Sequence, residues 1–222
     1  MMSDLKNQIL THINAGPRDR VWVPNDFAEL GGRDAVDKAL QRLVASGHLR
    51  RIDRGLYDRP RVNTLTKRLT PPDYRAVVAA IARRDKLRLL VDGMTAANDL
   101  GLTDAVPATV TIHTDARRRT IQLDNLTINF KLTAPSRLYW AGRPAMRVVQ
   151  ALHWLKDTLP SDESRIIKRL SKLMEETEEG EAIRDDLLAG FNTLPAWMQT
   201  VVRKLPGCDV PATDEATLPS GS

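Results

Sequence analysis

Residues 21–60 constrain the fold of this chain more than any other stretch of its 222 residues. After a Gly31-Gly32 turn, a helix is predicted from Arg33 to Gly47, because glycine is favoured just beyond a helix end. Its apolar residues recur at the spacing of one buried helix face: Val36, Leu40, Leu43 and Val44. The opposite face is polar and carries Arg33, Asp34, Asp37, Lys38, Gln41 and Arg42.

A short basic hairpin follows this helix. Residues 48–52 and 56–59 are strand-like runs around Asp53-Arg54-Gly55, with glycine where a turn favours a positive φ. Leu49 and Ile52 do not alternate strictly, which indicates a twist or bulge in the first strand. From residue 42 to residue 68, eight basic residues stand against two acidic ones. Contact with phosphate groups requires such a bias.

A helix, a glycine turn, a second helix and a basic hairpin are, in this order, the elements of a winged helix-turn-helix. We expect the preceding helix at residues 26–30, capped by Asn25, and a third strand at residues 21–23. The second helix would enter the major groove of DNA, with base contacts from Arg33, Lys38, Gln41 and Arg42. The hairpin would contact phosphates through Arg50, Arg51, Arg54 and Arg59. The alternative is a basic surface on a winged-helix module that binds protein.

The remainder of the chain predicts a second domain and an α+β fold overall. Between helical segments, residues 109–132 alternate with a period of two, which is typical of a small antiparallel sheet with one face on a core. We therefore predict a winged helix-turn-helix domain at residues 1–60 and a linker at 61–72. Residues 73–208 would form a C-terminal α/β-mixed domain of several helices and the small sheet. Residues 209–222 hold too little apolar surface to fold and are predicted to be a disordered tail.

Composition narrows the class of protein. No apolar run is long enough to span a membrane, and the N-terminus lacks the pattern of a secretory signal, so a cytoplasmic protein is expected. The single cysteine, Cys208, rules out an intramolecular disulfide. The four histidines lack metal-site spacing, and no phosphate-binding or nucleophile motif occurs. We expect no metal, no cofactor and no catalytic residues.

Charge is distributed unevenly within the net value of +5. Residues 1–70 and 71–160 each carry thirteen basic against eight acidic residues, whereas residues 161–222 carry seven against twelve. The acid is concentrated at residues 175–181, where a solvated surface is a better explanation than a functional patch. Arg117, Arg118 and Arg119 lie between two predicted strands, and so at an expected hairpin tip. They are a candidate second nucleic-acid contact, or a solvated loop.

Several of these segments resemble AbiEi-type antitoxins. In the N-terminal region, the resemblance rests on residues 35–40, Arg42-Leu43, 47–52 and Arg54-Gly55-Leu56-Tyr57. Further along, the similar segments are GMTAANDLGL at 93–102, VPA at 106–108, QALHWL at 150–155 and LPAWM at 194–198. Together they extend over most of the chain up to about residue 205. The first is a widespread winged-helix pattern, and the combination in this order is more specific.

The resemblance implies an antitoxin that represses its own operon and counteracts a nucleotidyltransferase-like toxin encoded beside it. The N-terminal domain would bind operator DNA, with self-association there left open, and the C-terminal domain would be required for antitoxicity. The toxin would be bound directly or opposed indirectly, and Arg117, Arg118 and Arg119 are an alternative contact for it.

Two other functions are consistent with the sequence. One is a winged-helix transcriptional regulator whose C-terminal domain dimerises or senses a ligand, with no toxin partner. The other is a metal-dependent nuclease, which needs convergence of Asp92, Asp99, Asp104, Asp115 and Asp124. Spacing does not predict that convergence, and turn and loop positions already account for Asp124 and Asp104.

Overall fold

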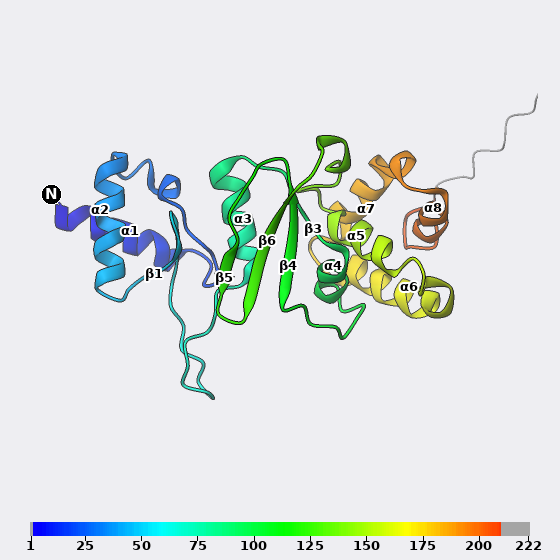
Figure 1. Ribbon diagram of the computed structural model, residues 1–222, viewed down its shortest axis with the longest axis horizontal. Coiled ribbons are helices and arrows are strands. Elements are labelled where there is room, and N and C mark those ends of the chain that lie inside the picture. The colour runs from blue at the N-terminus through cyan, green and yellow to red at the C-terminus, as the bar shows by residue number, and fades with distance from the viewer. Residues whose placement is uncertain (1, 210–222) are drawn as a thin grey trace, which may run out of the picture. The chain divides into compact units, whose positions relative to one another are not determined.

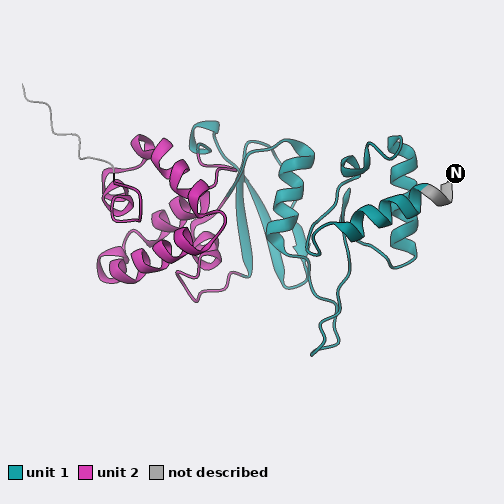
Figure 2. Cartoon of the chain, turned by 180° about the vertical axis from the view of Figure 1, so that it is seen from behind, with its two compact units in different colours: residues 1–90, 108–139 teal, residues 91–107, 140–222 magenta. Residues whose placement is uncertain are grey.

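The computed structural model describes residues 2–209, and side chains from residue 5. The fold is mixed α+β, as the sequence predicts. Two compact units divide the chain (Figure 2): unit 1 is Met1–Leu90 with Ala108–Tyr139, and unit 2 is Val91–Pro107 with Trp140–Ser222. Each unit is thus built from two separate stretches. The predicted disordered tail lies, apart from residue 209, outside the described residues.

The first part of unit 1 contains two helices, a single 3-10 turn and a hairpin (Figure 1). In chain order these are α1 (Met2–Ala15), η1 (Pro24–Phe27), α2 (Arg33–Ala45), β1 (Arg50–Asp53) and β2 (Leu56–Asp58). Strands β1 and β2 pair antiparallel, and the register shifts between Arg51 and Asp53, so the expected bulge is present. Trp22 pairs with Tyr57 in an isolated antiparallel bridge at the position of the predicted third strand, but the sheet itself consists of β1 and β2.

The segment before the glycine turn differs from the prediction. It is the 3-10 turn η1 at residues 24–27 instead of a helix at 26–30, and its N-cap is Val23 instead of Asn25. The Asp26 carboxylate accepts a hydrogen bond from the Val23 backbone N–H at 2.9 Å. Because Pro24 occupies the first helical position and lacks an N–H group, the turn begins directly after Val23.

Trp22 is central to the core of this part, where it is 1% exposed. Its ring stacks on Phe27 with centroids 5.6 Å apart, and His12 lies edge-on to it at 5.4 Å. A Cβ added to Gly16 would lie 2.7 Å from the indole, so the chain after α1 approaches the ring closely. The other buried members of this core are Ile9, Ile13, Val36, Ala39, Leu40, Leu43, Leu49 and Tyr57.

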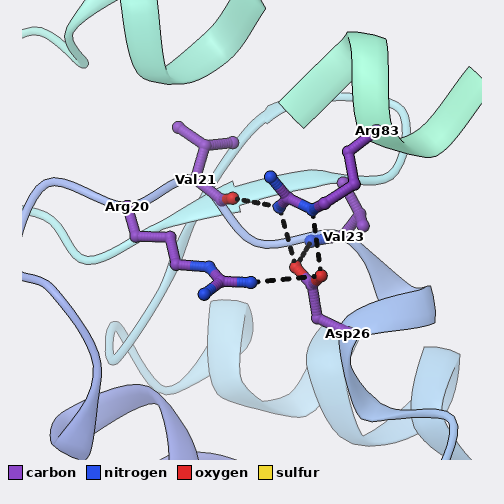
Figure 3. A network of polar contacts seen from close by, with 5 residues as sticks. All are labelled: Arg20, Val21, Val23, Asp26 and Arg83. Carbon is purple, nitrogen blue, oxygen red and sulfur yellow. Dashed lines mark hydrogen bonds and ion pairs between the residues drawn. The ribbon is translucent and has the colours of Figure 1, made fainter. Parts of the chain in front are cut away.

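Helix α3 (Tyr74–Asp85) is held to this first part by a polar network, drawn in Figure 3. Arg83 donates to the two carboxylate oxygens of Asp26, at 3.2 and 3.0 Å, and to the carbonyl of Val21 at 3.1 Å. Arg20 completes the network by donating to Asp26 at 3.4 Å. The Asp26 side chain is only 10% exposed, so one largely buried carboxylate joins two arginines and a backbone N–H.

Unit 1 also contains a mixed four-stranded sheet of order β3-β4-β6-β5. Its strands are β3 (Leu89–Val91), whose last residue belongs to unit 2, β4 (Thr109–Thr114), β5 (Ile121–Leu123) and β6 (Leu126–Leu132), and η2 (Pro135–Arg137) follows. The predicted antiparallel pairing is confirmed for β5 and β6, with Asp124 at a φ of 52° in their turn. Strand β4, however, runs parallel to β6.

This strand order corrects the placement of Arg117, Arg118 and Arg119. Because β6 separates β4 from β5, the two strands on either side of these arginines are not neighbours. The arginines lie in a crossover connection instead of at a hairpin tip. Alternation along a strand identifies its buried face but carries no information about which strand lies beside it.

The division of the chain differs from the predicted domains. The boundary predicted at residues 61–72 lies inside unit 1, and α3 and the sheet belong with the N-terminal elements. Residues 61–70 themselves form an ordered two-limbed loop, in which Val62 and Leu69 pair in an antiparallel bridge. Proline punctuation at residues 71–72 indicates a break in secondary structure, and the hydrogen bonds between Arg83 and Asp26 connect the segments on either side of that break.

Unit 2 is helical among its described residues. Its elements are α4 (Gly93–Asp99), α5 (Met146–Leu155), α6 (Leu159–Glu176), α7 (Gly180–Ala189), η3 (Phe191–Thr193) and α8 (Ala196–Val202). Helix α4 begins against α5: a Cβ added to Gly93 would lie 2.6 Å from the Trp154 Cβ and 2.7 Å from the Gln150 carbonyl. Arg147 pairs with Asp99, which is 4% exposed, across the same two helices.

We expect Asp26→Ala to lower the free energy of unfolding by about 1–3 kcal/mol, because it leaves two arginines and the Val23 N–H without their shared acceptor. Urea denaturation of the full chain measures the effect. Glu29→Ala is the matched control, since Glu29 is exposed and forms no ion pair with a described residue. Equal losses in the two variants would contradict the structural role of Asp26.

Candidate nucleic-acid interface

An open groove of about 750 Å³ lies on unit 1. Its walls come from η1, α2, the β1–β2 hairpin, the C-terminal end of α3 and the β4–β5 connection. The lining residues are Pro24, Arg33, Asp37, Gln41, Arg51, Asp53, Arg54, Gly55, Tyr57, Arg84, Asp85, Arg117, Arg118 and Arg119. Among the described residues, seven arginines and three aspartates line it, so the groove has a strong positive bias.

Helix α2 contributes Arg33, Asp37 and Gln41, which follow one another at i, i+4 and i+8 on one stripe of the helix. Arg33 donates to the Asp37 carboxylate at 2.9 Å, an exposed pair of the kind that contributes little to stability. The apolar stripe that includes Leu40 and Leu43 is buried, which turns the polar stripe outward. The same amphipathic pattern that builds the core therefore directs these polar side chains into the groove.

The hairpin contributes Arg51 and Arg54. Residues along β1 alternate between half-buried and exposed, and Arg51 is on the exposed side. Arg54 is exposed in the turn, where Gly55 adopts a φ of 69°. Tyr57, on β2, lines the base of the groove and is 5% exposed. Burial raises the pKa of its hydroxyl above the usual value, against the opposing charge of Arg51, so the phenol stays a neutral hydrogen-bond donor near pH 7.

The β4–β5 connection is fixed in the groove through Asp85. Arg118 pairs with the Asp85 carboxylate, which also accepts two hydrogen bonds from Arg84, at 3.0 and 2.9 Å. Arg84 additionally donates to the backbone carbonyl of Arg54 in the hairpin turn. The Arg118 guanidinium lies 5.7 Å from the Phe130 ring centroid. Asp85 and Arg84 thus tie the hairpin turn and the arginine-rich connection to the end of α3.

Four of the seven arginines have their charge available to a ligand. Within residues 2–209, the side chains of Arg51, Arg54, Arg117 and Arg119 form no hydrogen bond or ion pair, and all four are exposed. Guanidinium groups bind phosphate oxygens in a bidentate fashion, and anions concentrate in a concave site lined by one sign of charge. This arrangement is suited to a polyanion.

The structure brings together only some of the predicted site residues. Lys38 and Arg42 are exposed on α2 but do not line the groove. Arg50 forms an ion pair with Asp58 and donates to the Thr70 carbonyl at 3.0 Å. Arg59 donates to the Gly16 carbonyl at 3.2 Å. Arg50 and Arg59 therefore hold neighbouring segments of the chain in place.

Arg84 and Asp85 were not among the predicted site residues. In the sequence, Arg84 is one of a basic pair with Arg83 near the end of a predicted helix, the ordinary position of cations beside helix carbonyls, and Asp85 only follows that pair. Their role depends on the distance between α3 and the hairpin, which periodicity does not encode. The sequence predicts a contact role for the three arginines at residues 117–119, but spacing carries no information about their place in the groove that α2 also lines.

The five aspartates considered for a metal site do not gather in one place. Asp92 caps α4, where it accepts from the backbone and the hydroxyl of Thr95, and Asp99 pairs with Arg147. Asp115 pairs with Arg88, and Asp124 lies in the β5–β6 turn. Among the described residues, no cluster of three or more His, Cys, Asp or Glu side chains is placed to hold a metal ion.

In the same part of the chain, no helix is both long and apolar enough to cross a membrane.

Burial alone would raise the pKa of the Asp85 carboxyl, but the hydrogen bonds and charges of Arg84 and Arg118 outweigh burial and hold its pKa below the usual value. The stability that ionised Asp85 contributes is therefore present above the unfolded-state pKa, about 4, and is lost as pH falls through the lowered folded-state pKa. We expect the difference in unfolding free energy between the wild type and Asp85→Asn to be constant above about pH 5 and to shrink below about pH 4. Urea denaturation at several pH values measures it, with the exposed Asp104→Asn as control. A pH-independent difference would contradict this role.

Comparison with known proteins adds a family but no established activity. No curated protein matches the chain. A model described as a family of unknown function (DUF6088) matches residues 8–180, which is well over half of the sequence, and the chain therefore belongs to that family.

Proposed function

We propose that unit 1 binds double-stranded DNA, and that residues 1–60 act as a winged helix-turn-helix within it. The observation that carries the proposal is the convergence of three segments on one groove: the polar stripe of α2, the exposed arginines of the hairpin, and the arginines of the β4–β5 connection. The β4–β5 connection is distant in sequence from α2 and the hairpin, yet all three segments supply guanidinium groups to the same groove.

The proposed contacts divide into two classes. From α2, Arg33 and Gln41 face the groove, while Lys38 and Arg42 are exposed beside it. These residues would contact base edges and flanking phosphates, because arginine pairs with guanine and glutamine with adenine in the major groove. The phosphate contacts would come from the four arginines whose charges are not paired within the described chain: Arg51, Arg54, Arg117 and Arg119. Arg50 and Arg59 are assigned a positioning role.

A nucleic acid fits this groove better than an acidic protein. All seven cations that line it are arginines, and no lysine is among the lining residues. The planar guanidinium donates in a fixed fork that matches phosphate oxygens, and it is less strongly hydrated than an ammonium group. The lining is mainly polar, whereas stable protein interfaces have an apolar centre.

We further propose that the chain represses its own operon and is the antitoxin of a nucleotidyltransferase-like toxin. The resemblance to AbiEi-type antitoxins supports this role. Two of the similar segments, residues 93–102 and 150–155, meet in unit 2, where Gly93 packs against Gln150 and Trp154. Antitoxicity would reside in unit 2 and DNA binding in unit 1. The winged-helix regulator without a toxin is the alternative that the experiments below separate from this one.

For DNA binding, we expect the full chain to bind its own upstream DNA with an affinity that falls steeply with salt. Each lost phosphate contact reduces the slope of log K against log salt by about 0.9, so Arg51→Ala/Arg54→Ala should flatten it by about 1.8. Fluorescence anisotropy at four or more salt concentrations measures the slope. Arg137→Ala, which removes an exposed cation outside the groove, should leave the slope unchanged.

A separate outcome tests base contact. Gln41→Ala should relax preference at one base pair, by about 1–3 kcal/mol, while leaving the salt slope unchanged. If the wild type failed to bind DNA even at low salt, the proposal would be overturned, and the groove would have to serve a protein partner.

For antitoxicity, we expect expression of an adjacent nucleotidyltransferase-like reading frame to arrest growth, and co-expression of this chain to restore it. Gly93→Val should abolish protection, because its side chain would overlap Trp154 and the Gln150 carbonyl in unit 2. Arg51→Ala/Arg54→Ala should retain protection while losing repression of a promoter fusion. Failure of the wild type to restore growth, or absence of such a reading frame, would favour the regulator without a toxin, whereas equal protection by Gly93→Val would contradict the assignment of antitoxicity to this part of unit 2.

A further inference from the structure

Residues 61–70, which we call the arm, form an ordered projection from unit 1 (cyan in Figure 1). The two limbs are joined by backbone hydrogen bonds from Asn63 to Arg68 at 2.8 Å and from Thr70 to Arg61 at 2.7 Å. At the tip, the Asn63 side-chain oxygen accepts from the backbone N–H groups of Leu65 and Thr66, both at 2.9 Å. Hydrogen bonds, not a core, give the arm its shape.

The arm exposes apolar side chains that a free surface ordinarily avoids. Leu65 is 90% exposed at the tip, and the paired Val62 and Leu69 are 59% and 57% exposed. A two-stranded hairpin without a core is only marginally stable alone. The apolar residues of the arm therefore contribute little burial to this unit, and Leu65 contributes least.

The arm is also strongly basic. It carries Arg61, Lys67 and Arg68, all exposed, and residues 61–72 contain no acidic residue. Lys67 adopts a φ of 56°, in the left-handed region that favours glycine. This lysine is thus placed at a turn position where a glycine would be less strained. Cationic flanks around an apolar tip are complementary to a polyanion with stacked apolar bases.

Arg50 fixes the base of the arm to the hairpin. It donates to the Thr70 carbonyl at 3.0 Å and is itself held by Asp58. Beside this contact, Arg51, Arg68 and Leu69 line a second cavity of about 430 Å³. The arm therefore follows strand β2, whereas Arg51 lies on strand β1 of the same hairpin. The contact between Arg50 and Thr70 fixes the base of the arm relative to this hairpin.

We propose that the arm enters the minor groove of the bound DNA, with Leu65 as an apolar wedge at a base step. The inference rests on the DNA binding proposed above and adds the groove that this segment occupies. Turn residues 64–66 join limbs of three and four residues, 61–63 and 67–70, and a rise of ~3.3 Å per residue gives a reach of roughly 10 Å, more than the depth of the minor groove, about 7.5 Å. Apolar wedges flanked by cations are a common means of minor-groove binding.

Three variants of the full chain separate the contributions that the shape of the tip, the charge of Lys67 and the apolar side chain of Leu65 make to DNA binding. Leu65→Ala should weaken binding roughly 5- to 10-fold and reduce DNA bending, measured by energy transfer between end-labelled duplex ends. Lys67→Gly keeps the turn, because glycine accepts the positive φ, and should flatten the salt slope by about 0.9. Asn63→Ala keeps every charge and apolar side chain but removes the tip acceptor, and should reproduce the loss of bending. Val106→Ala, at another exposed apolar position, should change neither quantity.

Directed cleavage of the bound DNA identifies which DNA groove holds the tip of the arm. Cys208, the only cysteine, is fully buried and its pKa is raised by burial, so Leu65→Cys gives one reactive thiol for an iron-chelate label. Cleavage of the two strands offset in the 3′ direction would place the tip in the minor groove. A 5′ offset, or no localised cleavage while the labelled protein binds DNA, would overturn the arm proposal alone. Failure of the wild type to bind DNA would instead overturn the proposed function.

Discussion

Two adjacent arginines on α3 determine how unit 1 is assembled. Arg83 reaches back to Asp26 and the Val21 carbonyl, and Arg84 reaches the carbonyl of Arg54 in the hairpin turn. Removing either partner would leave polar groups without their hydrogen bonds, which costs more than the bond contributes when made. These contacts place the end of α3, and the sheet that follows it in the same unit, beside the N-terminal helices and the hairpin. The groove exists because of this placement.

Charge in unit 1 is divided between structure and surface. The aspartates with limited exposure, Asp26, Asp58 and Asp85, each hold arginines that join separate segments. Four groove arginines, Arg51, Arg54, Arg117 and Arg119, have side chains without a partner in the described chain and leave an uncompensated positive field. A net charge of +5 for the whole chain conceals this division, because the acidic excess of residues 161–222 offsets part of the basic excess of residues 1–160. The arrangement of the charges, more than their number, supports DNA as the partner.

The hairpin and the arm, two of the segments proposed to contact DNA, both depend on a turn for their shape. Gly55 allows the hairpin turn, and the Asn63 side chain organises the tip of the arm. Such segments contribute little burial to the fold, so their exposed residues are under no packing constraint. Arg50 links the two, because it bonds to Asp58 within the hairpin and to Thr70 at the base of the arm. In the proposed function, this residue aligns two DNA contacts without touching DNA itself.

Local pattern in the sequence was sufficient for the elements and for part of the site. Periodicity predicted α2, the hairpin and its bulge, because burial of one face imposes a repeat that a short window records. The polar stripe of α2 and the hairpin arginines followed from the same repeat. Only the tertiary structure decided the parallel pairing of β4 with β6, the grouping of residues 61–90 with the N-terminal elements, and the placement of residues 117–119 in the groove that α2 also lines. These features depend on contacts between segments far apart in the chain, and the side chains that make them, such as Arg84 and Asp85, have the same local sequence signal as ordinary surface charges.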